Sequence, residues 1–159
     1  MDILEDGSLD IDKELLAGLD WVVASVHYHR DQAQEEMTQR LLVAISSGVV
    51  HCIGHPCGRI IGKRDPIQCD WDNVFDACGQ NGVCLEIDSQ PDRLDLPDTH
   101  CRQAASYGVD FTITTDAHSA AGFDFMPLGV NVARRGWLEK GHVVNTANLS
   151  TLHKRLKLD

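Results

Sequence analysis

Short apolar runs alternate with longer amphipathic runs along this chain, and that alternation limits the folds available to it. Residues 21–26 (Trp-Val-Val-Ala-Ser-Val) predict a buried strand. Residues 32–47 place apolar side chains at helical spacing, and Gly48 follows where a helix would end. Strand and helix in turn are typical of βα units around a parallel sheet, so we expect an α/β fold.

The same pattern continues to the end of the chain. The further predicted strands are Val49–Ile53, Val83–Ile87 and Val109–Thr115, and the further predicted helices are Trp71–Cys78, Asp98–Tyr107 and Leu149–Leu158. Four clear strands are too few for a complete (β/α)8 barrel, which takes about 250 residues. We therefore expect either an open sheet or part of a barrel. No change of composition and no repeat divides the chain, so residues 1–159 are expected to form one domain.

Composition narrows the class of protein. The chain has 43% hydrophobic and 24% charged residues, which is typical of a folded globular protein. Its net charge of -10 argues against nonspecific adhesion to nucleic acid or to a membrane surface. The longest apolar stretches, 21–26 and 41–45, are too short to span a bilayer, and the amino terminus is acidic where a secretory signal is basic. We expect a cytoplasmic protein.

The six cysteines form an even set, which in a short secreted chain would suggest disulfides. They contain no Cys-x-x-Cys pair, and several lie within apolar runs. A chain of this length does not need covalent cross-links to fold. Reduced and mostly buried thiols are therefore expected.

Histidines and one aspartate fall where predicted strands end. His27 follows 21–26, His55 follows 49–53, and Asp116 with His118 follows 109–115. The carboxyl ends of parallel strands meet at one edge of a sheet, where α/β folds gather catalytic groups. Imidazole and carboxylate are the usual ligands of zinc, manganese and iron. A single histidine at a strand end is more often a surface residue, but three such ends together predict a metal site.

The other histidines carry less weight. His29 begins a loop and is expected to be solvated, whereas His51 lies about four residues before His55 and is expected in the core or at the opposite end of the sheet. The remaining ones, predicted to lie on the surface, are His100, His142 and His153.

Two arginines follow strands on the same side as the predicted ligands. Arg59 and Arg93 could each hold a phosphate through the planar guanidinium, although Arg93 could equally pair with a neighbouring aspartate. The chain has no Gly-x-Ser-x-Gly elbow, phosphate loop or dinucleotide fingerprint. A Cys-His hydrolase stays open because Cys57 is near His55 in sequence.

Several segments taken together resemble the polymerase-and-histidinol-phosphatase (PHP) domain, in particular the one at the carboxyl end of bacterial and archaeal X-family DNA polymerases. The matching segments are Ala24-Ser25-Val26-His27, Ile53-Gly54-His55-Pro56-x-Gly58-Arg59, Leu85-Glu86-Ile87, Asp92-Arg93-Leu94-Asp95-Leu96-Pro97-Asp98, Thr114-Thr115-Asp116-Ala117-His118 and Ala133-Arg134-Arg135-Gly136-Trp137. The resemblance runs nearly from end to end.

The resemblance implies a distorted (β/α)7 TIM-like barrel that holds up to three zinc or manganese ions, with 3′–5′ exonuclease or DNA 3′-end phosphoesterase activity and a place in DNA repair. Carried over by position, it implies that His27, His55, Asp116 and His118 are metal ligands. Asp116 and His118 are then the candidate catalytic residues, and Arg59 and Arg93 the candidate phosphate contacts.

The first strands and the first histidine motif of the family have no counterpart in this sequence. We therefore expect a partial barrel, the carboxyl-terminal two-thirds of the domain, with fewer divalent ions (zinc, manganese or iron) than the full site. Such a chain is expected to cleave DNA 3′ ends weakly or not at all, and to pair with another copy or with an upstream polymerase or PHP segment. The alternatives are a small-molecule phosphatase of the histidinol phosphatase type and a non-catalytic interaction module.

Overall fold

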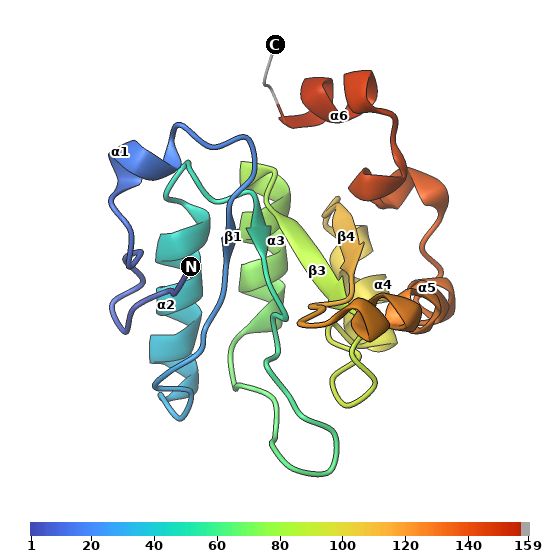
Figure 1. Cartoon of the computed structure of the whole chain (residues 1–159). Helices are drawn as coiled ribbons and strands as arrows, with labels where there is room; N and C mark the ends of the chain where they lie inside the picture. Colours follow the sequence, from blue (N-terminus) through green and yellow to red (C-terminus); the bar gives the residue numbers. More distant parts are fainter. Residues whose placement is uncertain (157–159) are drawn as a thin grey trace.

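A parallel sheet of four strands forms the centre of the computed structural model, which describes residues 1–156. The strands are β1 (Val23–Ala24), β2 (Cys52–Ile53), β3 (Cys84–Asp88) and β4 (Phe111–Thr114). The helices are α1 (Lys13–Leu16), α2 (Gln34–Ile45), α3 (Trp71–Asn81), α4 (Asp98–Ser106), α5 (Met126–Arg135) and α6 (Leu149–Leu156), with 3-10 turns at Ala120–Phe125, Lys140–His142 and Val144–Thr146. Figure 1 shows α2 and α3 running alongside the strands, with α6 set apart at the top of the view.

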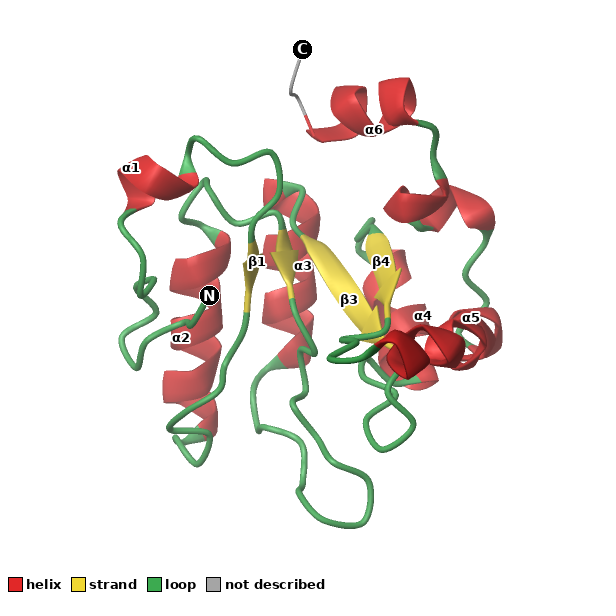
Figure 2. Ribbon diagram, in the orientation of Figure 1, coloured by secondary structure: helices red, strands yellow, loops and turns green. Residues whose placement is uncertain are grey.

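The strands are ordered β1-β2-β3-β4, so spatial order follows sequence order, and every neighbouring pair is parallel. Figure 2 shows the helices arranged around this small sheet. The predicted α/β class and the partial, distorted TIM-like barrel are confirmed to this extent. None of the helices within residues 1–156 is long and apolar enough to cross a membrane.

The two faces of the sheet differ in chemistry because side chains alternate along each strand. One row of paired residues, Ala24, Ile53, Leu85 and Phe111, faces the main core, where the helices pack. The adjacent row, Val23, Cys52 and Cys84, faces a second and smaller cluster with Val144. Glu86 and Thr112 continue this second, more polar face.

Three of the predicted strands are shorter than their apolar runs: β4 has Phe111–Thr114 in place of Val109–Thr115, and the first two strands have two residues each. In place of Val49–Ile53, only Cys52 and Ile53 join the ladder. The reason lies in the preceding turn: the N–H groups of His51 and Cys52 both donate to the carbonyl of Val22, and the His51 ring accepts from the Val22 N–H. In place of 21–26, β1 has two residues because Ser25 pairs instead with the amino-terminal segment.

The amino-terminal segment covers part of the β1 edge. Ile3 N–H donates to the Ser25 carbonyl at 2.9 Å, and Ser25 N–H donates to the Met1 carbonyl at 3.1 Å. Arg40, buried in α2, donates to the Ile3 carbonyl from the other side. On the far edge, Phe111 of β4 makes a parallel bridge to Val143.

Helix boundaries follow local chemistry. Asp70 is the N-cap of α3, and its Oδ1 accepts from Asn73 N–H at 3.2 Å. The helix runs on to Asn81, three residues beyond the predicted end at Cys78, and stops at Gly82, whose left-handed backbone (φ 68°) suits glycine. The predicted terminal helix begins at Leu149 as expected, and its last two predicted residues, 157 and 158, lie outside the described residues.

The predicted state of the cysteines is confirmed. All six are free thiols, and all six are buried. They lie in both clusters of the interior: Cys84 and Cys52 on the polar face of the sheet, Cys78 and Cys101 in the main core.

Candidate metal and phosphate site

His27 and His55 come together at the carboxyl ends of the neighbouring strands β1 and β2. Their ring centroids are 5.1 Å apart with the planes nearly perpendicular. The His27 side chain is 47% exposed, whereas His55 as a residue is 9% exposed. The sheet therefore brings two of the four predicted ligands into contact, one reachable from solvent and one behind it.

A carboxylate that the sequence analysis did not single out holds His27. Its Nδ1 is hydrogen-bonded to Oδ1 of Asp2, on the amino-terminal segment that bridges to Ser25. This contact occupies Nδ1, so Nε2 is the ring nitrogen that could meet a metal ion. A carboxylate behind one ring nitrogen is the usual way in which proteins fix a metal-binding histidine. No local pattern links Asp2 to His27 across 25 positions, so only the fold could reveal it.

His55 stands on a strained turn fixed by Glu86. Its backbone has φ 31°, in the left-handed region that a non-glycine residue rarely adopts. Its N–H donates to Oε2 of Glu86 on β3 at 2.5 Å, and Oε1 of Glu86 accepts from Thr114 Oγ1 at 2.7 Å. Strain of this kind persists where the surroundings over-determine a conformation, which is common at functional sites.

The chemistry of the His55 ring suits a neutral ligand. Burial lowers the pKa of His55 to about 4, and the positive charges of Arg93 and His27 act in the same direction. The ring is therefore uncharged at neutral pH, the form that coordinates a metal. Its Nδ1 is buried and has no hydrogen-bond partner within the described residues.

Asp116 and His118 follow β4, as the sequence predicts. Asp116 has φ 44°, a second left-handed residue at a strand end. Its carbonyl accepts from His118 Nδ1 at 2.7 Å and from Gln90 Nε2 at 3.2 Å. The negative charge of Asp116 raises the pKa of His55, but burial of the His55 ring lowers it by more. Asp116 thus lies at the same edge of the sheet as the histidine pair.

The four predicted ligands do not form one compact cluster. Among residues 1–156, no group of three or more His, Cys, Asp or Glu side chains is placed to hold a metal ion. The fit is therefore partial: His27 and His55 suit two positions around a divalent ion, and His55 leaves a buried nitrogen unbonded. Asp116 and His118 lie at the same edge without completing the set.

Asp88, at the end of β3, is a further candidate that the sequence analysis missed. It is fully buried, and burial raises its pKa to about 7, with the charges of Glu86 and Asp116 acting in the same direction. Its Oδ1 accepts from Gln90 N–H at 2.8 Å, and its Oδ2 lies 3.5 Å from Nε of Arg93. In sequence this residue only ends an apolar run, so nothing marks it as titratable near neutral pH.

The two candidate arginines have different surroundings. Arg59 donates through Nε to the Arg93 carbonyl at 2.8 Å and through Nη2 to the Leu94 carbonyl at 2.5 Å. Its guanidinium therefore holds the loop that carries Arg93. The Arg93 side chain is 22% exposed and pairs with Asp88, which was one of the two interpretations of the sequence. Its positive charge lowers the pKa of His55. Of the two, Arg93 is the better placed to meet a phosphate.

The position of Cys57 does not support the Cys-His hydrolase that the sequence left open. The Cys57 Sγ lies 3.6 Å from Nδ1 of His100, not beside His55, and burial raises the Cys57 pKa well above its ordinary value. His100, expected on the surface, is half-buried between Trp71 and Phe75, whose ring centroids lie 4.9 and 5.8 Å away. A thiol that stays protonated is a poor nucleophile.

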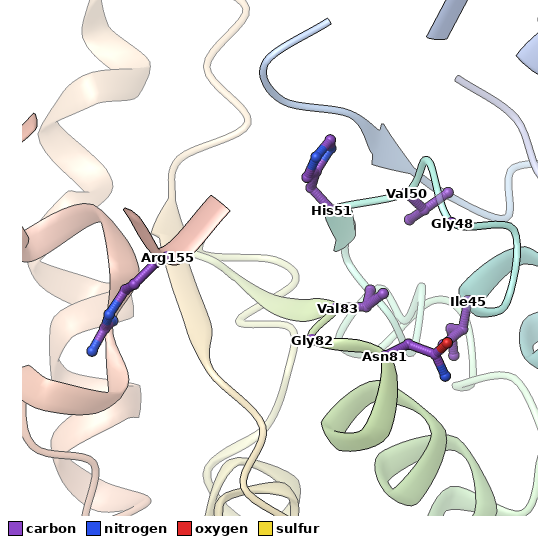
Figure 3. Close-up of a pocket in the computed structure, with 8 residues that line it drawn as sticks. All are labelled: Ile45, Gly48, Val50, His51, Asn81, Gly82, Val83 and Arg155. Carbon is purple, nitrogen blue, oxygen red and sulfur yellow. The ribbon is translucent and has the colours of Figure 1, made fainter. Parts of the chain in front are cut away.

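A cavity of about 210 Å³ lies at the other end of the sheet, beside His51 and Val83. The prediction that His51 belongs to the opposite end is confirmed: it stacks on Trp21 and precedes β2. Figure 3 shows the Arg155 side chain pointing away from the other labelled residues. This cavity is separate from the strand ends that carry His27 and His55.

Comparison with known proteins places these residues in a family context. No family model matches the chain. It is 39% identical over 157 residues to the DNA polymerase/3′-5′ exonuclease PolX of Bacillus subtilis, covering 99% of this chain and 28% of that protein. It is 32% identical over 125 residues to a probable phosphatase of Photobacterium profundum, covering 73% and 48%. A probable phosphatase of Thermoanaerobacter sp. is 26% identical over 151 residues, covering 89% and 59%.

The chain spans between about a quarter and three-fifths of the length of these relatives. The similarity to the polymerase nevertheless runs along nearly the whole chain, in agreement with the segments around His27, His55 and Asp116. The chain therefore resembles the PHP domain of the X-family DNA polymerases along nearly its whole length.

Proposed function

We propose that this chain carries a metal-dependent phosphoester-hydrolysing site that acts on DNA 3′ ends, in the manner of a 3′–5′ exonuclease. The observation that carries the proposal is the contact between His27 and His55, whose rings lie 5.1 Å apart at neighbouring strand ends. The relative named as a DNA polymerase/3′-5′ exonuclease supports DNA as the substrate class.

Different residues would hold the metal ion, contact the phosphate and transfer a proton. His27 and His55 would hold a divalent ion such as zinc or manganese, with Asp116 and His118 approaching from β4. When bound, such an ion supplies Lewis-acid chemistry toward a phosphoester. Arg93 would meet a phosphate oxygen, and Asp88, with a pKa of about 7, can hold or release a proton near neutral pH.

The test is a paired measurement of metal content and hydrolysis. Protein purified without chelator is analysed for zinc, manganese and iron, and is then assayed on a 5′-labelled single-stranded oligonucleotide with a free 3′ hydroxyl. We expect bound metal and 3′-end shortening, with both lost in His55→Ala and in Asp116→Ala/His118→Ala. His142→Ala is the control because His142 lies in a 3-10 turn outside the strand ends. Metal and hydrolysis that persist in His55→Ala would overturn the proposal.

A second candidate is a small-molecule phosphatase, supported by the relatives named as probable phosphatases. A panel of phosphomonoesters beside the oligonucleotide separates the two: release of phosphate from small substrates with no shortening of DNA would favour this alternative. A third candidate, an interaction module without catalysis, is supported by the lack of a three-residue metal cluster within residues 1–156. Metal-free, inactive protein would favour it.

A further inference from the structure

An exposed tryptophan and two arginines form a surface that the proposed hydrolytic site does not use. Trp137 is 68% exposed, and the guanidinium of Arg102 lies over its ring, 3.7 Å from the centroid. Arg134, near the end of α5, is also exposed, and its backbone carbonyl accepts from the Trp137 N–H at 3.1 Å. We call Arg102, Arg134 and Trp137 the tryptophan patch.

The backbone holds Trp137 outward. The residue has φ 60°, a left-handed conformation that costs a bulky side chain strain energy. It stands between Ala133 and Leu138, both buried, which are joined by a hydrogen bond of 3.0 Å from Leu138 N–H to the Ala133 carbonyl. The indole is thus fixed on the surface by anchors on either side.

Gly136 brings this turn against α4. A Cβ at that position would lie 2.8 Å from Cβ of Cys101 and 2.9 Å from the Asp98 carbonyl, so only glycine allows the approach. The approach lets Arg135 bind Asp98 at 2.8 Å and places Arg102, one helical turn after Asp98, over the indole. Arg135 therefore serves as an anchor, and Arg102 and Arg134 supply the positive charge of the patch.

The arrangement suits a nucleic-acid strand. Arg102 covers one face of the indole, and the large exposure of Trp137 leaves ring surface for a planar partner. Bases stack on exposed aromatic side chains regardless of sequence, and neighbouring arginines pair with the phosphates. In a chain with a net charge of -10, a polyanion needs such a local cationic surface. We propose that the tryptophan patch binds single-stranded nucleic acid, with a base stacked on Trp137 and phosphates held by Arg102 and Arg134.

The test uses fluorescence anisotropy of a fluorescein-labelled oligothymidylate in buffer with EDTA, so that binding is measured without hydrolysis or metal. Trp137→Gly is the informative variant because glycine accepts φ 60° without strain and the fold should keep its Tm. We expect this variant to raise the Kd roughly 5- to 100-fold, as loss of one stacked base predicts. Trp137→Phe should recover most of the affinity.

The charge contribution has its own readout. Arg134→Gln should weaken binding and lower the slope of log K against log salt by about 0.7, the value for one phosphate contact on a single strand. A duplex of the same length should bind less tightly because its bases are already stacked. Oligothymidylate should also quench the fluorescence of the wild type and not that of Trp137→Phe.

Matched controls come from the same chain. Phe123 is also 68% exposed but belongs to another turn, so Phe123→Ala should leave the Kd unchanged. Arg155→Gln removes a positive charge from α6 and should likewise change little. An unchanged Kd in Trp137→Gly, or equal effects in the patch variants and these controls, would overturn the inference. Since the assay contains EDTA, its failure is distinguishable from failure of the hydrolytic proposal.

Discussion

The backbone N–H of His55 donates a hydrogen bond of 2.5 Å to Oε2 of Glu86, which lies on the adjacent strand. Burial raises the pKa of Glu86, whereas its hydrogen bonds from Thr114 and His55 act against that rise. The carboxylate therefore fixes the strained turn that sets the His55 ring beside His27. It acts on the site without facing the solvent.

We predict that Glu86→Ala weakens metal binding by about 10- to 100-fold, the usual effect of losing a group that orients a ligand. Competition against a chromophoric zinc chelator measures this. Thr114→Val is the control, since it removes the neighbouring bond to Glu86 and keeps the one to His55. Equal affinities of wild type and Glu86→Ala would show that the carboxylate has no positioning role.

Asp88 should make stability depend on pH. Its folded-state pKa of about 7 lies above the ordinary value of 3.8, so the folded protein binds the proton more tightly than the unfolded chain. The stability that this proton contributes is present below pH 3.8 and is lost as the pH rises toward 7. The substitution Asp88→Asn removes this pH dependence. The increase in unfolding free energy that it causes should therefore be about 2 kcal/mol larger at pH 8 than at pH 5.

Urea unfolding at the two pH values measures this gain. Asp92→Asn, which removes an exposed carboxylate from the following loop, is the matched control. A pH-independent effect of Asp88→Asn would mean that Asp88 is ionised in the folded protein throughout the range.

The two arginines should separate stability from substrate binding. Arg59→Ala removes two hydrogen bonds to the carbonyls of residues 93 and 94, and should lower the unfolding free energy by about 2 kcal/mol. Arg93→Ala should instead raise the KM for a phosphoester several-fold with a smaller loss of stability, because its side chain faces the site. Thermal unfolding and steady-state kinetics on both variants distinguish the roles. A KM effect confined to Arg59→Ala would reverse the assignment.

The thiols should be inert in the folded protein. All six cysteines are buried, and burial raises the pKa of Cys69, Cys78, Cys84 and Cys101 to about 12. A thiol reagent at pH 8 should therefore label the native protein slowly and label all six thiols after denaturation in guanidinium. Rapid labelling of one native thiol would reveal local opening around that residue.

The sequence predicted the βα order and the strand-end positions of His27, His55 and Asp116, because apolar periodicity and strand ends are local features. The predicted second strand was too long, because the His51 ring accepts a hydrogen bond from the Val22 N–H where a backbone group would otherwise pair. The sequence analysis also predicted no helix at Met126–Arg135. The roles of Asp2 and Glu86 depend on contacts 25 and 31 positions away, which no spacing encodes. Arg59 was expected to meet substrate because its loop lies at the right edge, and only packing shows it bonded to the next loop.

The sheet is paired unequally along its width. β3 and β4 match four residue pairs, whereas β1 and β2 match two. Backbone amides on the β3–β4 side should therefore exchange with deuterium far more slowly than those on the β1 side. On this prediction His27 follows the strand that opens most readily, and Asp116 follows the strand that opens least. A ligand that bound both His27 and Asp116 would link the β1 side of the sheet to the β4 side. It would slow amide exchange chiefly around β1.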